Sequence, residues 1–290
     1  MKHEFPQEIS SNFEGYRGLI DFYNKTSALA FDRIILDFAK TTWLEANLIA
    51  VLGAILNKVQ SGLNEVKIEN LSSNIRNVLS RNHFLSHFGG LKIPDYYKTT
   101  IKYRKFKRAE EKLFKEYLDG ELLSKEAMPD MSSLLRKKIN ESIFEIFNNA
   151  VIHGNCSHIF SCGQYYPQKK RLDFTIVDLG KTIKANVTGY VNRNLSGKDS
   201  IKWAVAEGHT TKQGQIPGGL GLSLIREFLE KNNGKIQIIS SDGYWEQEGQ
   251  GKRDGSFPQT FSGTIVNLEF NIDDKSHYCL LSEIDKDNIF

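Results

Sequence analysis

The second half of the chain contains the sequence Glu141-Ser-Ile-Phe-Glu145-Ile-Phe-Asn-Asn149-Ala-Val-Ile-His153-Gly154. Glu145, Asn149 and His153 are four residues apart, so on a helix they form one polar stripe. The neighbouring apolar stripe consists of Ile139, Ile143, Ile146 and Ala150. This spacing predicts an amphipathic helix from Ser132 to His153.

The polar stripe has residue types that suit a Mg-nucleotide site. The amide oxygen of Asn149 is a hard ligand for Mg²⁺, and the carboxylate of Glu145 can take a proton from an attacking water or hydroxyl group. A solvated polar face would have the same spacing, so this motif needs support from the rest of the chain.

Two further motifs lie downstream. In Phe174-Thr-Ile-Val-Asp178-Leu-Gly180, an apolar strand ends in an acid that can accept a hydrogen bond from an adenine amino group, and the glycine lets the backbone approach the base. In Pro217-Gly-Gly-Leu-Gly-Leu222, three glycines lead directly into an amphipathic helix, and such a helix start is a phosphate cradle. Lys212 is close enough in sequence to add a positive charge.

Between these motifs the pattern predicts further elements. Two strands are expected at residues 159–165 and 172–178, followed by a long irregular segment. After the glycine-rich loop we expect a helix to Asn233, a strand at residues 235–241, a hairpin, and a last strand at residues 263–272.

The ordered set Glu145-x-x-x-Asn149, Asp178-x-Gly180, Thr210-Thr-Lys212 with the Gly218 loop, and Gly263-Thr264 resembles the GHKL ATPase superfamily, which includes histidine kinases and gyrase. The resemblance covers Ser132 to Asp273. It implies an α/β sandwich with a mixed sheet (the Bergerat fold) that binds ATP and Mg²⁺.

The resemblance also implies roles for individual residues. Glu145 matches the general base and Asn149 the Mg²⁺ ligand, while Asp178, followed by Gly180, reads adenine, and Thr264 shares a water with the base. Residues 182–217 match the mobile ATP lid. The phosphates are held by Gly218, Gly219, Leu220, Gly221 and Leu222, with Thr211 and Lys212 meeting the γ-phosphate. The family usually has a second glycine two residues after Gly180, where this chain has Thr182.

The first part of the chain predicts a small α/β unit with parallel strands. A strand at residues 33–38, a helix from Glu45 to Val59, a strand at residues 65–69 and a helix to Arg81 capped by Ser72 or Ser73 succeed one another. This order resembles a STAS domain, the fold of anti-anti-sigma factors. Where those domains carry a phosphorylated serine, this chain has Glu45-Ala46-Asn47, so the phosphoacceptor is missing.

The stretch from Tyr97 to Lys125 is rich in charge, with basic residues first and acidic residues after them. Opposite charges about four residues apart indicate an exposed connecting helix. We therefore expect two α/β domains: a STAS-like regulatory or interaction domain at residues 1–95, a charged connector at 96–130, a GHKL domain at 131–275 and a tail at 276–290.

Composition narrows the function classes. The net charge of +3 does not by itself indicate a nucleic-acid or membrane partner. Three cysteines cannot form a disulfide framework, so a cytoplasmic protein is expected. The longest apolar stretch, Leu48 to Leu56, is far shorter than the ~20 residues of a membrane span. A zinc site at His153, Cys156, His158 and Cys162 is disfavoured, because the spacing matches no zinc motif.

The leading functional hypothesis is ATP binding with slow Mg-dependent hydrolysis, which drives a conformational switch. Two alternatives stay open: a serine/threonine kinase acting on a separate STAS-type partner, and a nucleotide-gated interaction module without turnover. The retained Glu145 argues against the latter. We expect a protein partner, such as a STAS-type or other regulatory protein. A homodimer is compatible with each hypothesis, and neither a nucleic-acid nor a membrane partner is expected.

Overall fold

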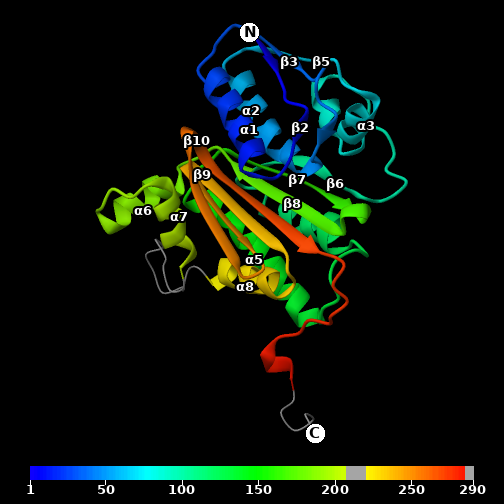
Figure 1. The fold of residues 1–290 in the computed structure, drawn as a ribbon, viewed down its shortest axis with the longest axis vertical. Helices are drawn as coiled ribbons and strands as arrows, with labels where there is room; N and C mark the ends of the chain where they lie inside the picture. Colours follow the sequence, from blue (N-terminus) through cyan, green and yellow to red (C-terminus); the bar gives the residue numbers. More distant parts are fainter. Residues whose placement is uncertain (207–219, 285–290) are drawn as a thin grey trace.

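A five-stranded sheet forms the centre of the computed structural model, which describes residues 1–206 and 220–284 (Figure 1). Its strands, in spatial order, are β6 (Thr100–Lys107), β7 (His158–Tyr166), β8 (Arg171–Asp178), β10 (Gly251–Asn271) and β9 (Lys235–Glu248). Every neighbouring pair is antiparallel. The prediction of a mixed sheet is therefore wrong for these five strands. Short turns join β7 to β8 and β9 to β10, and such hairpins make neighbouring strands antiparallel.

Helices α5 (Ser133–Ile152) and α8 (Leu220–Lys231) cover one face of this sheet. The predicted helix from Ser132 is confirmed, and Ser132 is its N-cap, accepting a hydrogen bond from the amide of Leu135 at 3.1 Å. The apolar side of α5, including Ile139, Ile143 and Phe147, is buried against the sheet.

An N-terminal unit covers the opposite face (Figure 1). Its parallel sheet has the order β1-β3-β5, and its strands alternate with helices in the predicted way. The elements are β1 (Lys2–Glu4), β2 (Glu8–Ile9), α1 (Phe13–Thr26), β3 (Arg33–Asp37), β4 (Trp43–Leu44), η1 (Ala46–Leu48), α2 (Ile49–Ser61), β5 (Glu65–Glu69), α3 (Ser73–Arg81) and η2 (Phe84–Phe88).

Helix α2 is buried on almost every side because it lies between the parallel sheet and the five-stranded sheet. A helix that is apolar all round needs such a position. The stretch from Leu48 to Leu56 is therefore a core helix. In the part of the chain that the structure describes, no helix is both long and apolar enough to cross a bilayer.

The charged stretch from Tyr97 to Lys125 is not the exposed helix that its charges predict. Its first part is β6, an edge strand whose Ile101, Tyr103 and Phe106 are buried between exposed basic residues. Charged side chains on an edge strand prevent pairing with other chains. The acidic part forms α4 (Glu111–Tyr117) and a π-helical turn, η3 (Leu118–Leu123), which pack into the same core as α5. The boundaries of the two domains stay a prediction.

The segment after Asp178 is also more regular than expected. It contains α6 (Ile183–Val191) and α7 (Gly197–Val205) before the described part ends at residue 206. Thr182, which replaces a glycine of the family pattern, caps α6 by accepting from the amide of Ala185 at 3.1 Å. The threonine at this position is therefore the N-cap of helix α6.

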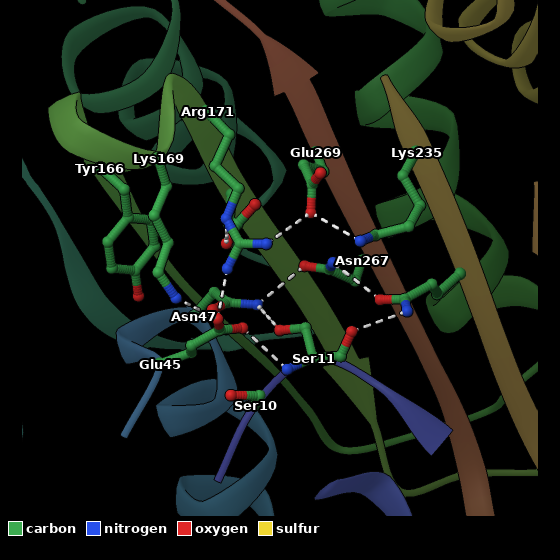
Figure 2. Close-up of polar contacts among 12 residues, drawn as sticks. Ser10, Ser11, Glu45, Asn47, Tyr166, Lys169, Arg171, Lys235, Asn267 and Glu269 are labelled. Carbon is green, nitrogen blue, oxygen red and sulfur yellow. Dashed lines mark hydrogen bonds and ion pairs between the residues drawn. The ribbon is translucent and has the colours of Figure 1, made fainter. Parts of the chain in front are cut away.

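A buried polar layer joins the N-terminal unit to the five-stranded sheet (Figure 2). Thr175, Asn267 and Gln237 lie side by side on β8, β10 and β9. Asn47, fully buried at the start of η1, donates to Thr175 Oγ1 at 3.1 Å and to Asn267 Oδ1 at 2.9 Å. It also donates to Ser11 Oγ at 2.8 Å.

A chain of alternating charges lies beside this layer (Figure 2). Arg171 binds Glu45 of the N-terminal unit and, at 3.1 Å, Glu269 on β10, which Lys235 contacts at 2.8 Å. Asp173 is completely buried next to this chain, 3.3 Å from Arg171 Nε. Burial, followed by the neighbouring Glu269 carboxylate, raises the pKa of Asp173 well above its ordinary value.

We predict that Arg171→Met lowers the free energy of unfolding by about 3–5 kcal/mol, because it leaves Glu45 buried without its main cation. Lys170→Met is the matched control, since Lys170 is 60% exposed in its pair with Asp273. Urea denaturation of both variants measures the difference. An equal, small loss in both would show that the charge chain does not hold the two parts together.

Candidate functional site

The sheet face that carries α5 has a cavity of about 160 Å³ at the end of β8. It brings together the three residues that the sequence motifs single out: Glu145 and Asn149, one turn apart on α5, and Asp178 on β8. The walls are largely apolar and come from α5, α6 and the sheet. They include Ile146, Ile176, Ile183, Val187, Ile238 and Val266. An apolar cleft with a few polar groups is typical of a small-molecule site.

Asp178 is the most deeply buried charged group of the site, at 4% exposure. Its Oδ1 accepts from the amide of Gly180 at 2.8 Å. Burial raises the pKa of Asp178 to about 7, while the backbone amides of Gly180 and Thr264 act in the opposite direction. Burial therefore disfavours the ionised form of the Asp178 carboxyl group.

Glycines are needed around Asp178 for close backbone packing. A Cβ on Gly180 would lie 2.1 Å from the carbonyl oxygen of Gly154, and the amide of Lys181 donates to that same oxygen at 2.6 Å. This contact ties the end of α5 to the end of β8. Gly263 has φ +112°, and a Cβ there would meet the Asp178 carbonyl oxygen at 2.1 Å. The motif predicts that Gly180 lets the backbone approach a base; in the structure the backbone of Gly180 packs against Gly154.

Thr264 lies directly across from Asp178 in the β10–β8 register and also lines the cavity. Its hydroxyl is 3.2 Å from that of Ser240 on β9, a residue that the sequence motifs missed. Ser240 is buried and also contacts Ile183 at the start of α6. No motif signals this serine, because only the strand register brings it to the site.

The predicted phosphate-binding residues are only partly described. Thr211, Lys212, Gly218 and Gly219 lie outside the described residues. Leu220 and Gly221 begin α8, and Leu222 lines the cavity. The start of α8 thus lies beside the cavity, where an anion would meet the positive end of the helix.

The segment expected to be irregular contributes a wall that the sequence argument missed. Asn186 of α6 donates to the carbonyl oxygen of His153 at 3.0 Å, which fixes α6 on the end of α5. Trp203 and Ala204 of α7 line the cavity on the same side. The capping residues Thr182 and Ser196 are the signals that could have revealed these two helices.

The sequence matches no known family model and no curated protein. Glu145, Asn149 and Asp178 are therefore candidate site residues because of their motifs and because they line one cavity.

The amide of Asn149 is an oxygen ligand that this cavity could offer to a metal ion. Among the described residues, no cluster of three or more His, Cys, Asp or Glu side chains could hold a metal. Mg²⁺ typically keeps several waters and takes one or two protein ligands beside substrate phosphates. The Asn149 amide oxygen, with the start of α8 nearby for phosphates, fits that pattern.

Cys156 and Cys162 are not among the residues that line this cavity, whereas His153 is. Cys156 Sγ contacts the carbonyl oxygen of Ala150 at 3.2 Å, and burial raises the pKa of its thiol to about 12. Cys162 Sγ is directed to the carbonyl oxygen of Ile101 at 3.5 Å, in the core beneath the N-terminal unit.

We predict that Asp178→Asn stabilises the protein at pH 8 but not at pH 4. The unfolded chain releases this proton near pH 4 and the folded protein near pH 7, so stability is lost as the pH rises between these values. Asparagine removes a loss of at most a few kcal/mol, at ~1.4 kcal/mol per pKa unit. Thermal denaturation at both pH values measures it, with the exposed Asp273→Asn as control. A gain that is the same at both pH values would contradict the assignment.

Proposed function

We propose that this chain binds Mg-ATP in the cavity at the end of β8 and hydrolyses it slowly, in the manner of the GHKL superfamily. One observation carries this proposal. Helix α5 and strand β8 carry two separate sequence motifs. Their residues Glu145, Asn149 and Asp178 line one largely apolar cavity.

The adenine end of the cavity is formed by Asp178, Thr264 and the apolar walls. A buried carboxylate accepts hydrogen bonds from an amino group, and Ile176, Ile238 and Val266 supply an apolar surface for the base. An amino donor that reaches this carboxylate offsets the energetic cost of burying it.

The phosphate end is formed by α5 and the start of α8. In this proposal Asn149 holds a Mg²⁺ ion, which supplies charge neutralisation for the phosphates. Glu145, one turn earlier, orients the attacking water and takes its proton. Leu222 places the first turn of α8 at the same cavity.

The N-terminal unit is the regulatory part of the proposed switch. It packs on the side of β8 opposite the cavity, and its Asn47 binds Thr175, three residues before Asp178. A nucleotide that shifts β8 would change these contacts, and a ligand acts on a conformation only through such differential contact.

Asp178→Asn tests the binding part of the proposal. We expect it to abolish ATP binding while the protein stays folded, because the adenine amino group would face another donor or a weaker acceptor. Isothermal titration calorimetry at pH 8 with Mg-ATP measures this, with Asp273→Asn again as the control. Unchanged affinity would show that Asp178 does not read a base.

Glu145→Ala tests the catalytic part. We expect Mg-ATP binding to persist and turnover to fall by about 10² or more, the usual contribution of a positioned base. The control is Glu141→Ala, an exposed carboxylate one turn earlier on the same helix. Equal phosphate release by the wild type and Glu145→Ala would make Glu145 a polar-face residue.

A further inference from the structure

Ser240 is a buried serine on β9 whose hydroxyl has three partners. It lies across from Thr264 in the strand register. Its Oγ is 2.6 Å from the carbonyl oxygen of Gly263, 2.9 Å from the amide nitrogen of Ile183 and 3.2 Å from Thr264 Oγ1. No solvent reaches the residue, which is 0% exposed.

Counting donors fixes the direction of these three hydrogen bonds. A hydroxyl group has one proton to donate and can accept two hydrogen bonds. The Gly263 carbonyl can only accept, so it takes the Ser240 proton, while the Ile183 amide can only donate. The remaining contact must then be donated by Thr264. With its proton used in this way, Thr264 presents only lone pairs to the cavity.

Asp178 faces Thr264 across the strand pair and, when ionised, is also only an acceptor. The side chains of Asp178 and Thr264 therefore both present acceptors to this end of the cavity. We propose that Ser240 is a positioning residue that holds Thr264 as an acceptor, so that the cavity selects 6-aminopurine over 6-oxopurine nucleotides. This inference rests on the proposed ATP-binding function and adds a determinant of its base specificity.

Removing the Ser240 hydroxyl should release the Thr264 proton. The Thr264 hydroxyl can then turn and donate into the cavity, directly or through a water, toward an oxygen at position 6. The loss of the bond to Ile183 would also loosen the start of α6. Loosening α6 would weaken the binding of both nucleotides to the same extent. Only the ratio of the two affinities therefore reports on the direction of the hydrogen bond.

The test compares ATP with inosine triphosphate, in which an oxygen acceptor replaces the amino donor at position 6. The N1–H group of inosine can still donate to Asp178, but it does so in every variant, so the readout is the change in the affinity ratio between variants. Calorimetry on the full chain at pH 8 gives the affinity ratio for the wild type, Ser240→Ala, Thr264→Val and the double variant. We expect Ser240→Ala to lower the preference for ATP by about three- to tenfold, the worth of one hydrogen bond. In the Thr264→Val background the same change should leave the ratio unaltered.

The other outcomes separate the proposed role of Ser240 from the proposed binding of ATP. If the wild type binds ATP but Ser240→Ala keeps its ratio, or if the ratio shifts equally without the Thr264 hydroxyl, the role of Ser240 is wrong and ATP binding stands. If the wild type binds neither nucleotide, the proposed function fails, and the selectivity inference with it. Should the alanine variant not fold, Ser240→Cys keeps the volume with a poorer acceptor and must shift the ratio in the same direction.

Discussion

Strand β8 has to be buried on both faces, and the rest of the structure depends on this constraint. Seven of its eight residues are buried. Leu172, Phe174 and Ile176 belong to the core under α5, whereas Val177 belongs to the core under the N-terminal unit. A sheet with one solvated face could place Asp173 and Thr175 in water. Here the N-terminal unit covers them, so this unit is a structural layer of the sheet.

Covering a polar face requires that its groups find partners, and this requirement explains the start of η1. The resemblance to STAS domains aligns Ala46 and Asn47 with the region of a phosphorylated serine. In this chain the same region packs against the five-stranded sheet, and Asn47 is 0% exposed. The amide of Ala46 donates to the hydroxyl of Tyr166 at 2.8 Å. A phosphate there would have to be desolvated against Glu45, which electrostatics strongly disfavours. Asparagine instead joins three hydrogen-bonding groups without adding charge.

In the cavity, unlike in the buried polar layer, a charged group is buried with few hydrogen-bond partners. Asp178 is buried with few compensating donors, and its raised pKa expresses the cost of ionising it there. Gly154, Gly180 and Gly263 allow three backbone segments to meet around it at distances that no side chain would permit. Carboxyl groups whose pKa is raised by burial occur often at functional sites. Because side chains alternate along a strand, residues two apart face the same side, so Ile176 with Asp178 on β8 and Val266 with Thr264 on β10 all line the cavity and give it apolar walls and one polar end.

The features that depend on local periodicity could be predicted from the sequence alone. The four-residue spacing of Glu145 and Asn149 predicted helix α5 and one polar stripe, and Asp178 at the end of an apolar run predicted a strand-end carboxylate. Local rules also predicted the strand–helix order of the N-terminal unit and the cap at Ser72. They failed for β6, because alternating basic residues on an edge strand and an exposed helix have similar charge patterns. Only the tertiary structure decided that Asp173 and Thr175 are buried, that Ser240 meets Thr264, and that α6 and α7 wall the cavity. These outcomes depend on strand register and on contacts between segments more than 50 residues apart, such as Ile183 with Ser240, and local spacing carries no record of them.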